Sequence, residues 1–238
     1  SAPTGSGKTL IGESAIHRAL AHGQKVFYTT PLKALSNQKL RDFRDQFGAE
    51  NVGLMTGDLS VNREASIVVM TTEIFRNMLY AEADEHDDPL ADVEAVVLDE
   101  CHYMNDSQRG TVWEESIIHC PPTVQLVALS ATVANAGQLT DWIEKVHGPT
   151  TLVMSDHRPV PLQFSFCSAK GLHPLLNEAG TGLHPNCKVW RAPKGHKRKG
   201  RSQRPPQPEP PPISFVVAQM AERQMLPAIY FIFLSLIH

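Results

Sequence analysis

The first nine residues restrict the fold of this chain more than any other feature. Residues 2–9 match the phosphate-binding pattern G-x-x-x-x-G-K-[ST], except that alanine takes the first glycine position. The matching residues are Ala2, Pro3, Thr4, Gly5, Ser6, Gly7, Lys8 and Thr9. Glycines let such a loop turn so that its backbone N–H groups point at phosphate oxygens. The alternative is a plain Gly/Ser-rich turn before a helix. In that case the agreement of the other positions with the phosphate-binding pattern would be a coincidence.

Strands and helices then alternate along the chain. Apolar periodicity predicts a helix after Thr72, together with helices over residues 10–22, 35–47, 112–119 and 135–146. Short runs of β-forming residues predict strands at 25–30, 52–55, 66–70, 93–98, 125–129 and 151–154. This alternation is typical of an α/β fold in which helices cover both faces of a parallel sheet. Because a phosphate-binding loop normally follows a strand, we expect this sheet to lack its first strand.

The character of the sequence changes near Asp156. We expect an α/β domain over residues 1–155, an extended connector over 156–180 and a basic, proline-rich linker over 181–212. Residues 171–212 look poorly ordered, and a helix at 213–224 and a strand at 229–234 follow them. Residues 188–204 hold eight Lys or Arg and no acid, which suits either a solvated linker or contact with phosphate backbone.

Composition limits the cellular compartment and the kinds of partner that this chain could have. The net charge of −3 by itself indicates neither nucleic acid nor a membrane, and the apolar tail at 229–237 is shorter than the roughly 20 residues of a membrane helix. Four scattered cysteines without a C-x-x-C pair argue against a zinc site and a disulfide scaffold, so a reducing compartment fits best. The chain starts inside a motif and without Met, so we expect a piece of a longer protein.

Two segments supply the chemistry of nucleotide hydrolysis. Lys8 can reach the β- and γ-phosphates of ATP, and the Thr9 hydroxyl can ligate Mg²⁺. A buried strand ends in acid at Asp99 and Glu100, at the edge of the sheet where α/β proteins bind ligands. Asp99 is placed to hold Mg²⁺, Glu100 to polarise the attacking water, and His102 to sense the γ-phosphate. An Asp-Glu pair after a strand is often only a helix cap, and the phosphate-binding loop gives this pair its weight.

Ser130 and Thr132 come at the end of another apolar strand. Two small hydroxyls at that place can link the nucleotide site to a moving part of the protein. A helix N-cap is the alternative reading.

Three further segments suit nucleic acid. Residues 30–39, 56–58 and 71–73 each follow a strand and offer N–H groups, hydroxyls and amides to phosphate oxygens. Ordinary helix capping explains any one of them equally well. Since only 7% of the residues are aromatic, we expect readout of the backbone rather than base stacking.

The motifs APTGSGKT, TTPLKALSNQK, TGD, TTE, DECH and SAT occur in the order found in superfamily 2 helicases. Over residues 1 to about 180 the chain resembles the first RecA-like domain of Ski2-like DExH-box RNA helicases, with the plastid or cyanobacterial type nearest. The resemblance implies ATP hydrolysis coupled to 3′-to-5′ movement along RNA, with Lys8, Asp99, Glu100 and His102 catalytic and Ser130 and Thr132 coupling hydrolysis to unwinding. It implies an RNA surface at Pro31, Lys33, Gln38, Gly57, Asp58, Thr72 and Glu73.

The resemblance also implies a second RecA-like domain, of which residues 213–238 look like the start. In the family that domain supplies arginine fingers, so we expect little activity from this chain alone. The alternatives are a truncated, non-catalytic nucleotide- or RNA-binding product and a DNA helicase or translocase of the same superfamily. The resemblance implies an intracellular location; it favours a plastid and leaves cytoplasm and nucleus open.

Overall fold

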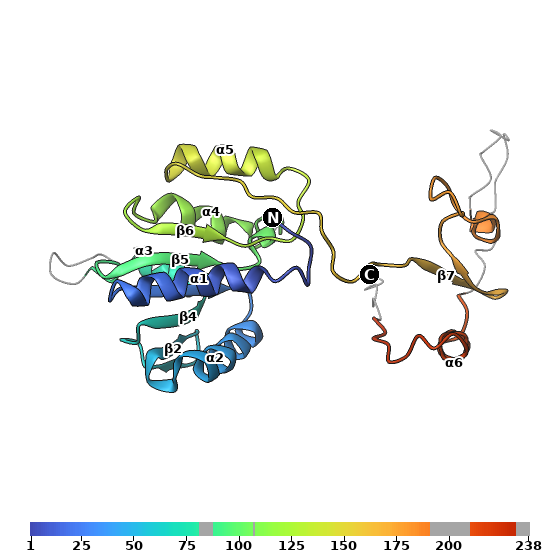
Figure 1. Cartoon of the computed structure of the whole chain (residues 1–238), viewed down its shortest axis with the longest axis horizontal. Helices are drawn as coiled ribbons and strands as arrows, with labels where there is room; N and C mark the ends of the chain where they lie inside the picture. The colour runs from blue at the N-terminus through green and yellow to red at the C-terminus, as the bar shows by residue number, and fades with distance from the viewer. Residues whose placement is uncertain (81–87, 107, 191–209, 232–238) are drawn as a thin grey trace, which may run out of the picture. The chain divides into compact units, whose positions relative to one another are not determined.

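The computed structural model describes residues 1–80, 88–106, 108–190 and 210–231. The chain divides into two compact units, Ser1–Val160 and Pro161–His238 (Figure 1). Each unit is described by itself.

The first unit is built on a six-stranded sheet with the order β3-β2-β4-β1-β5-β6. The strands are β1 (Lys25–Thr30), β2 (Val52–Met55), β3 (Ser60–Val61), β4 (Ile67–Thr71), β5 (Val93–Leu98) and β6 (Gln125–Ala128). All neighbours pair in parallel except β3, which pairs antiparallel with β2 at the edge. The mostly parallel sheet confirms the predicted α/β class.

Helices cover both faces of this sheet. The α-helices are α1 (Lys8–Ala21), α2 (Lys33–Phe47), α3 (Thr72–Tyr80), α4 (Gly110–His119) and α5 (Ala136–Val146). Two short 3₁₀ helices lie between them, η1 (Ala49–Asn51) and η2 (Cys101–Asn105). The predicted helices are all present, and their ends differ from the prediction by about two residues, as is usual for helix boundaries.

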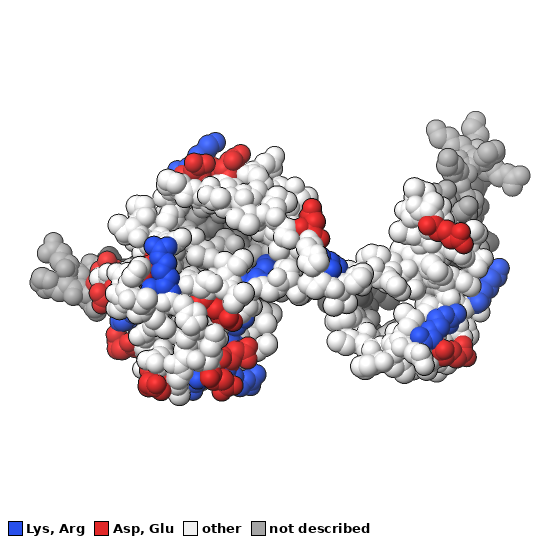
Figure 2. Space-filling model, in the orientation of Figure 1, with Lys and Arg blue, Asp and Glu red and all other residues white. Residues whose placement is uncertain are grey.

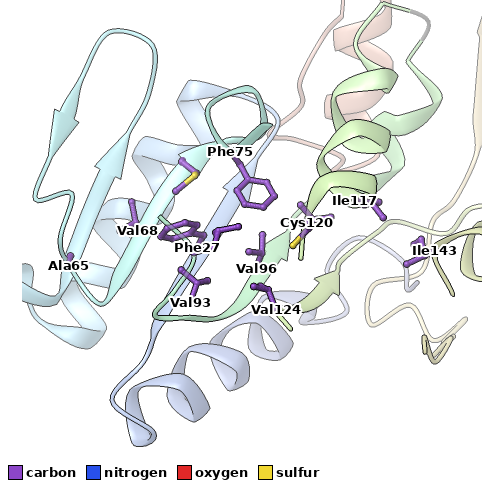
Figure 3. Close-up of a cluster of buried hydrophobic side chains, with 13 residues drawn as sticks. Phe27, Ala65, Val68, Phe75, Val93, Val96, Ile117, Cys120, Val124 and Ile143 are labelled. Carbon is purple, nitrogen blue, oxygen red and sulfur yellow. The ribbon is translucent and has the colours of Figure 1, made fainter. Parts of the chain in front are cut away.

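The core lies on both sides of the sheet, because successive side chains of a strand point to opposite faces. In β1, Phe27 packs with Phe75 of α3 and Ile117 of α4 on one face (Figure 3). Tyr28, its neighbour, is buried on the other face with Phe43 of α2. β5 alternates in the same way, so the central strands are buried on both sides.

The predicted strand at residues 151–154 is wrong. These residues are exposed and extended, and within the described residues they form no ladder with β6. Their backbone meets Ser1 instead: the Ser1 N-terminus donates to Val153 O at 2.8 Å, and Ser155 N donates to Ser1 O at 3.1 Å. Contact with a single residue is too short for a ladder, so an apolar, β-branched run is left without strand structure.

The second unit contains a hairpin that the sequence analysis missed. Strands β7 (Ser165–Ser168) and β8 (Gly171–Pro174) pair antiparallel, followed by the 3₁₀ helix η3 (Pro185–Trp190) and helix α6 (Ile213–Glu222). The prediction that residues 171–212 are poorly ordered is therefore wrong for 171–190, because Gly171, at φ 114°, lets the chain turn back onto β7.

The remaining sequence expectations for this unit fall largely beyond what the structure describes. Most of the basic tract, residues 191–204, and residues 232–234 of the predicted last strand lie outside the described residues. The described part of that strand, 229–231, forms none, so the prediction is wrong there: these residues have no strand partner in the described ranges. None of the helices in those ranges is both long and apolar enough to cross a bilayer.

A chain ending at residue 160 is expected to stay folded and to aggregate less than the full chain. The cut follows the boundary of the first unit and removes Ile229, Tyr230 and Phe231, which are 83%, 57% and 72% exposed. Light scattering on heating and far-UV circular dichroism check this result. Faster aggregation of the shortened chain would contradict it, since residues 161–238 would then protect the first unit.

Candidate functional site

The loop at residues 2–9 has the backbone that its glycines predict. Gly5 and Gly7 adopt φ angles of 84° and 80°, in the left-handed region that residues with a Cβ rarely enter. Helix α1 begins directly after Gly7, at Lys8. The first N–H groups of a helix have no partner within it, so this turn and helix start have the backbone geometry that can bind an anion.

Lys8 and Thr9 are both held by contacts within the site. Lys8 Nζ donates to the carbonyl oxygens of Ala2 at 2.9 Å and Pro3 at 3.1 Å. Thr9 Oγ1 accepts a hydrogen bond from Lys39 Nζ, 3.0 Å away on helix α2. An incoming phosphate would therefore replace the loop's own carbonyls as the partner of the Lys8 ammonium.

The acids after β5 are positioned by the neighbouring strand β1. Asp99 N donates to Thr29 O at 3.0 Å, and Tyr28 Oη donates to Asp99 Oδ2 at 2.8 Å. Burial, followed by the charge of Asp99, raises the pKa of Tyr28, so the phenol remains a donor. Glu100 then turns the chain sharply, with a left-handed φ of 53°, into η2.

His102 lies between the acids and the Ser130 segment. Its Nδ1 is 3.3 Å from Glu100 Oε2 and 3.5 Å from Ala131 N. One nitrogen cannot serve both partners, because the first contact needs a proton on Nδ1 and the second needs a lone pair. The tautomer of His102 therefore determines whether Nδ1 bonds to Glu100 or to Ala131 N.

Ser130, two residues after the end of β6, contacts the loop at residues 2–9. Its carbonyl accepts a hydrogen bond from Ala2 N at 3.1 Å, so the phosphate-binding loop lies directly against it. Thr132, the other predicted coupling residue, is exposed. Cys101, the first residue of η2, is a packing residue: burial raises the pKa of its thiol to about 12, which removes nucleophilic character at neutral pH.

The donor set fits Mg²⁺. The Thr9 hydroxyl and the Asp99 carboxylate are hard oxygen ligands, which Mg²⁺ prefers together with water and nucleotide phosphates. Among the described residues no three His, Cys, Asp or Glu side chains are grouped as a metal site. The protein would thus supply only part of the coordination shell.

The predicted nucleic-acid segments meet at the carboxyl ends of β1, β2 and β4. They border a groove of about 420 Å³, lined by Pro31, Leu32, Lys33, Gly57, Thr71, Glu73, Ile74, Asn77 and Arg109. Three predicted residues do not line the groove: Gln38 is exposed on α2, Asp58 follows the lining residue Gly57, and Thr72 is buried, with its hydroxyl donating to Thr30 O at 3.3 Å.

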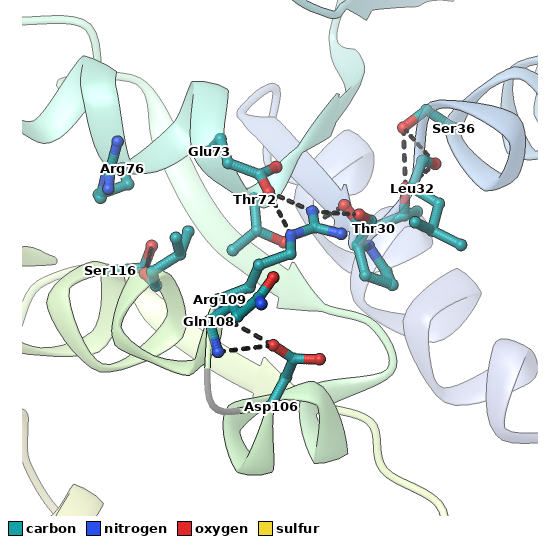
Figure 4. Close-up of polar contacts among 12 residues, drawn as sticks. Thr30, Leu32, Ser36, Thr72, Glu73, Arg76, Asp106, Gln108, Arg109 and Ser116 are labelled. Carbon is teal, nitrogen blue, oxygen red and sulfur yellow. Dashed lines mark hydrogen bonds and ion pairs between the residues drawn. The ribbon is translucent and has the colours of Figure 1, made fainter. Parts of the chain in front are cut away.

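The charged residues of the groove are paired. Lys33 Nζ forms an ion pair with Asp58, and the guanidinium of Arg109 forms one with Glu73. Arg109 also donates from Nη2 to the Pro31 carbonyl at 2.7 Å, so it joins two predicted nucleic-acid segments (Figure 4). On the face shown in Figure 2, acidic and basic side chains are interspersed over the first unit.

Two residues of this region were missed from the sequence, Tyr28 and Arg109. Lys39 belongs to the predicted segment 30–39 and closes the LSNQK motif, but its hydrogen bond to Thr9 was not expected. Tyr28 in a buried strand and Arg109 before α4 carry no sequence signal of their own, because only the fold brings them to their partners.

Comparisons with known proteins agree with this arrangement. A family model described as DEAD/DEAH box helicase matches residues 1–139, which include the loop, both acids and the groove. The chain is 56% identical over 186 residues to the chloroplastic DExH-box ATP-dependent RNA helicase DExH15 of Arabidopsis thaliana, covering 77% of this chain and 16% of the relative. It is 44% identical over 246 residues to the probable helicase HelY of Mycobacterium tuberculosis, covering 98% and 27%.

Other matches point the same way. The exosome RNA helicase MTR4 of Homo sapiens is 48% identical over 183 residues, with 76% of this chain and 17% of the relative covered. The solved Mycobacterium smegmatis helicase Lhr, bound to ssDNA and AMP-PNP, matches with a TM-score of 0.50 and 28% identity over 64% of this chain and 23% of its own. The chain thus spans about a quarter or less of the length of these proteins.

Proposed function

Because this chain belongs to the DEAD/DEAH box helicase family, with Ski2-like DExH helicases as relatives, we propose that it is the ATP-binding domain of an ATP-dependent RNA helicase. One observation carries the proposal. The phosphate-binding loop and the segment that carries the acids both bond to the chain after β6: Ala2 N donates to Ser130 O at 3.1 Å, and Cys101 N, directly after Glu100, donates to Leu129 O at 2.8 Å. The candidate RNA groove opens at the carboxyl ends of the neighbouring strands.

In the proposed mechanism the phosphates of ATP replace the Ala2 and Pro3 carbonyls as the hydrogen-bond partners of the Lys8 ammonium. Thr9 and Asp99 would hold Mg²⁺, which would supply charge neutralisation for the phosphates. Lys39 would have to release the Thr9 hydroxyl for that hydroxyl to serve as a ligand, since two cations repel each other at that distance. Glu100 orients and polarises the water that attacks the γ-phosphate.

Coupling is proposed to pass through His102 and Ser130. The Ser130 carbonyl touches the loop at Ala2, and Ala131 N lies beside His102. A change of partner at His102 Nδ1 on hydrolysis would move the Ser130 segment relative to Glu100. RNA is proposed to lie along the groove at Pro31, Lys33 and Gly57.

We further propose that a second RecA-like domain completes the motor in the whole protein, because the matched part makes up only 16% and 27% of two of its relatives. An arginine finger from such a domain contributes about 10³ to 10⁵ in rate. The chain alone is therefore expected to turn over ATP slowly. An intracellular site is proposed, and the chloroplastic relative favours a plastid.

The proposal is tested by phosphate release from Mg-ATP, with single-stranded RNA or DNA of the same sequence. Slow release that RNA stimulates is expected, and Glu100→Gln should reduce it about 100-fold while ATP still binds, because the water loses its base. Glu144→Gln, an exposed change on α5, is the control.

Two results would favour the other functions. Binding of ATP and RNA without release above the Glu100→Gln level indicates a non-catalytic binding module. Stronger stimulation by DNA indicates a DNA translocase, a reading that the ssDNA complex of Lhr supports.

A further inference from the structure

We propose that Arg109 is a positioning residue of the RNA groove, and that Glu73 acts on RNA through Arg109 rather than by touching it. The proposal rests on the proposed function, because it needs the groove to bind RNA. Glu73 lines the groove that is proposed to hold phosphates, and Asp58 lies beside its lining residue Lys33. Unpaired carboxylates at these places would repel the ligand. Both have a cationic partner instead.

The geometry makes Arg109 the junction of three segments. Its Nε donates to Glu73 Oε1 at 3.1 Å, at the start of α3, and its Nη2 donates to Pro31 O at 2.7 Å, directly after β1. Arg109 itself precedes α4, which follows β5 by way of η2. In Figure 4 its side chain reaches from this segment toward Glu73 and the loop after Thr30. A fork of N–H donors fixes direction as well as distance, which a lysine cannot do.

The backbone that carries Arg109 is itself held in place. Asp106 Oδ1 accepts hydrogen bonds from the N–H groups of Gln108 at 2.9 Å and Arg109 at 3.0 Å. A Cβ at Gly110 would lie 2.2 Å from Met104 O, so only glycine allows this close approach of η2 and α4. The guanidinium therefore projects from a fixed base.

The same segment leads back to the nucleotide site. Helix η2 starts at Cys101, immediately after Glu100, and ends four residues before Arg109. A displacement of Glu100 or His102 would therefore be passed to Arg109, and from there to the Pro31 loop and to Glu73. Arg109 thus couples the distance between the two proposed RNA-binding loops to the positions of Glu100 and His102.

This role and a purely electrostatic role predict opposite results for Glu73→Gln. Removing a negative charge beside RNA should tighten binding if Glu73 only adds to the field of the groove. If Glu73 holds Arg109, the same change should weaken binding. Arg109→Lys tests the other half of the pair, because it keeps the charge and loses the fork.

The experiment measures binding of labelled single-stranded RNA to the full chain by fluorescence anisotropy at several salt concentrations. Glu73→Gln, Arg109→Lys and Arg109→Gln are each expected to weaken binding about three- to tenfold. The double change Glu73→Gln with Arg109→Gln should be no worse than the single ones, since both break one contact. The matched control is Arg76→Gln, at an arginine three residues after Glu73 on α3 that pairs with Glu115 at 3.4 Å, and it should change affinity less than twofold.

Salt dependence separates positioning from direct contact. A lost phosphate contact lowers the slope of log K against log salt by about 0.7 for single strands, whereas loss of a positioning residue leaves the slope unchanged.

Tighter binding by Glu73→Gln, unchanged binding by Arg109→Lys, or a reduced slope for Arg109→Gln would overturn the proposal. Mg-ATP affinity serves as the folding check for each variant, and Glu73→Gln, a near-isosteric change at a partly exposed side chain, decides alone if the Arg109 variants fail to fold. Absence of RNA binding by the unaltered chain would instead count against the proposed function.

Discussion

Replacing Lys8 by alanine is expected to weaken Mg-ATP binding at least tenfold. The ammonium is the one side-chain cation that the loop at residues 2–9 carries, and it already makes two hydrogen bonds at 2.9 and 3.1 Å. A hydrogen bond to a charged group contributes about 1.5–3 kcal/mol, and about 1.4 kcal/mol is a factor of ten in affinity. Displacement of a fluorescent ATP analogue in the presence of Mg²⁺ measures the loss.

Two controls separate phosphate binding from collapse of the loop. Lys145→Ala removes an exposed lysine from α5 and should leave the affinity unchanged. Lys8→Ala without nucleotide should melt close to the unaltered chain, because the two hydrogen bonds that Lys8 makes to the Ala2 and Pro3 carbonyls are only partly buried. Equal ATP affinity in the Lys8 variant would show that the loop is not the phosphate site.

The sequence predicted the sheet best where strands are buried on both sides. β2 and β5 begin and end at the predicted residues, because each is a short apolar run bounded by polar or glycine-containing turns. Residues 151–154 have the same composition, yet they form no strand, since a strand exists only where neighbouring backbone completes its hydrogen bonds. Local pattern gives the propensity for a strand, while pairing depends on the rest of the chain.

The site divides in the same way. Candidate residues that belong to a local motif could be proposed from the sequence: Lys8, Thr9, Asp99 and Glu100 lie in a loop or at the end of a strand. The residues that hold them could not, because their contacts are remote: 71 positions separate Tyr28 from Asp99, 30 separate Lys39 from Thr9, and 36 separate Arg109 from Glu73. Nothing in the local sequence of a lone tyrosine or arginine encodes such a partner.

Resemblance also left the chemistry of two carboxylates unexplained. It implied Asp58 and Glu73 as part of an RNA surface without a reason why acids should stand there. Their ion pairs with Lys33 and Arg109 supply one, since a neutralised pair can hold a cation at a fixed place beside phosphate. This explanation needs side-chain geometry and could not come from the motif alone.

Replacing Trp113 by alanine is expected to destabilise the first unit by about 3–5 kcal/mol, the usual cost of removing a large aromatic side chain from a core. Trp113 of α4 is fully buried and stacks on Tyr103 of η2 with ring centroids 6.0 Å apart. Its loss would leave a cavity beneath the segment that runs from Glu100 to Arg109. ATP affinity and RNA affinity should therefore fall together with stability.

Urea unfolding followed by far-UV circular dichroism measures this loss, with two variants for comparison. Trp113→Phe keeps most of the packing and gives up no hydrogen bond, because the buried indole N–H has no acceptor among the described residues, so it should lose less than half as much stability. Trp142→Ala makes the same change at a partly buried tryptophan of α5 and should cost less, since fewer contacts disappear. A loss below about 1 kcal/mol for Trp113→Ala would mean that α4 and η2 close over the cavity, and the acids would then not depend on this support.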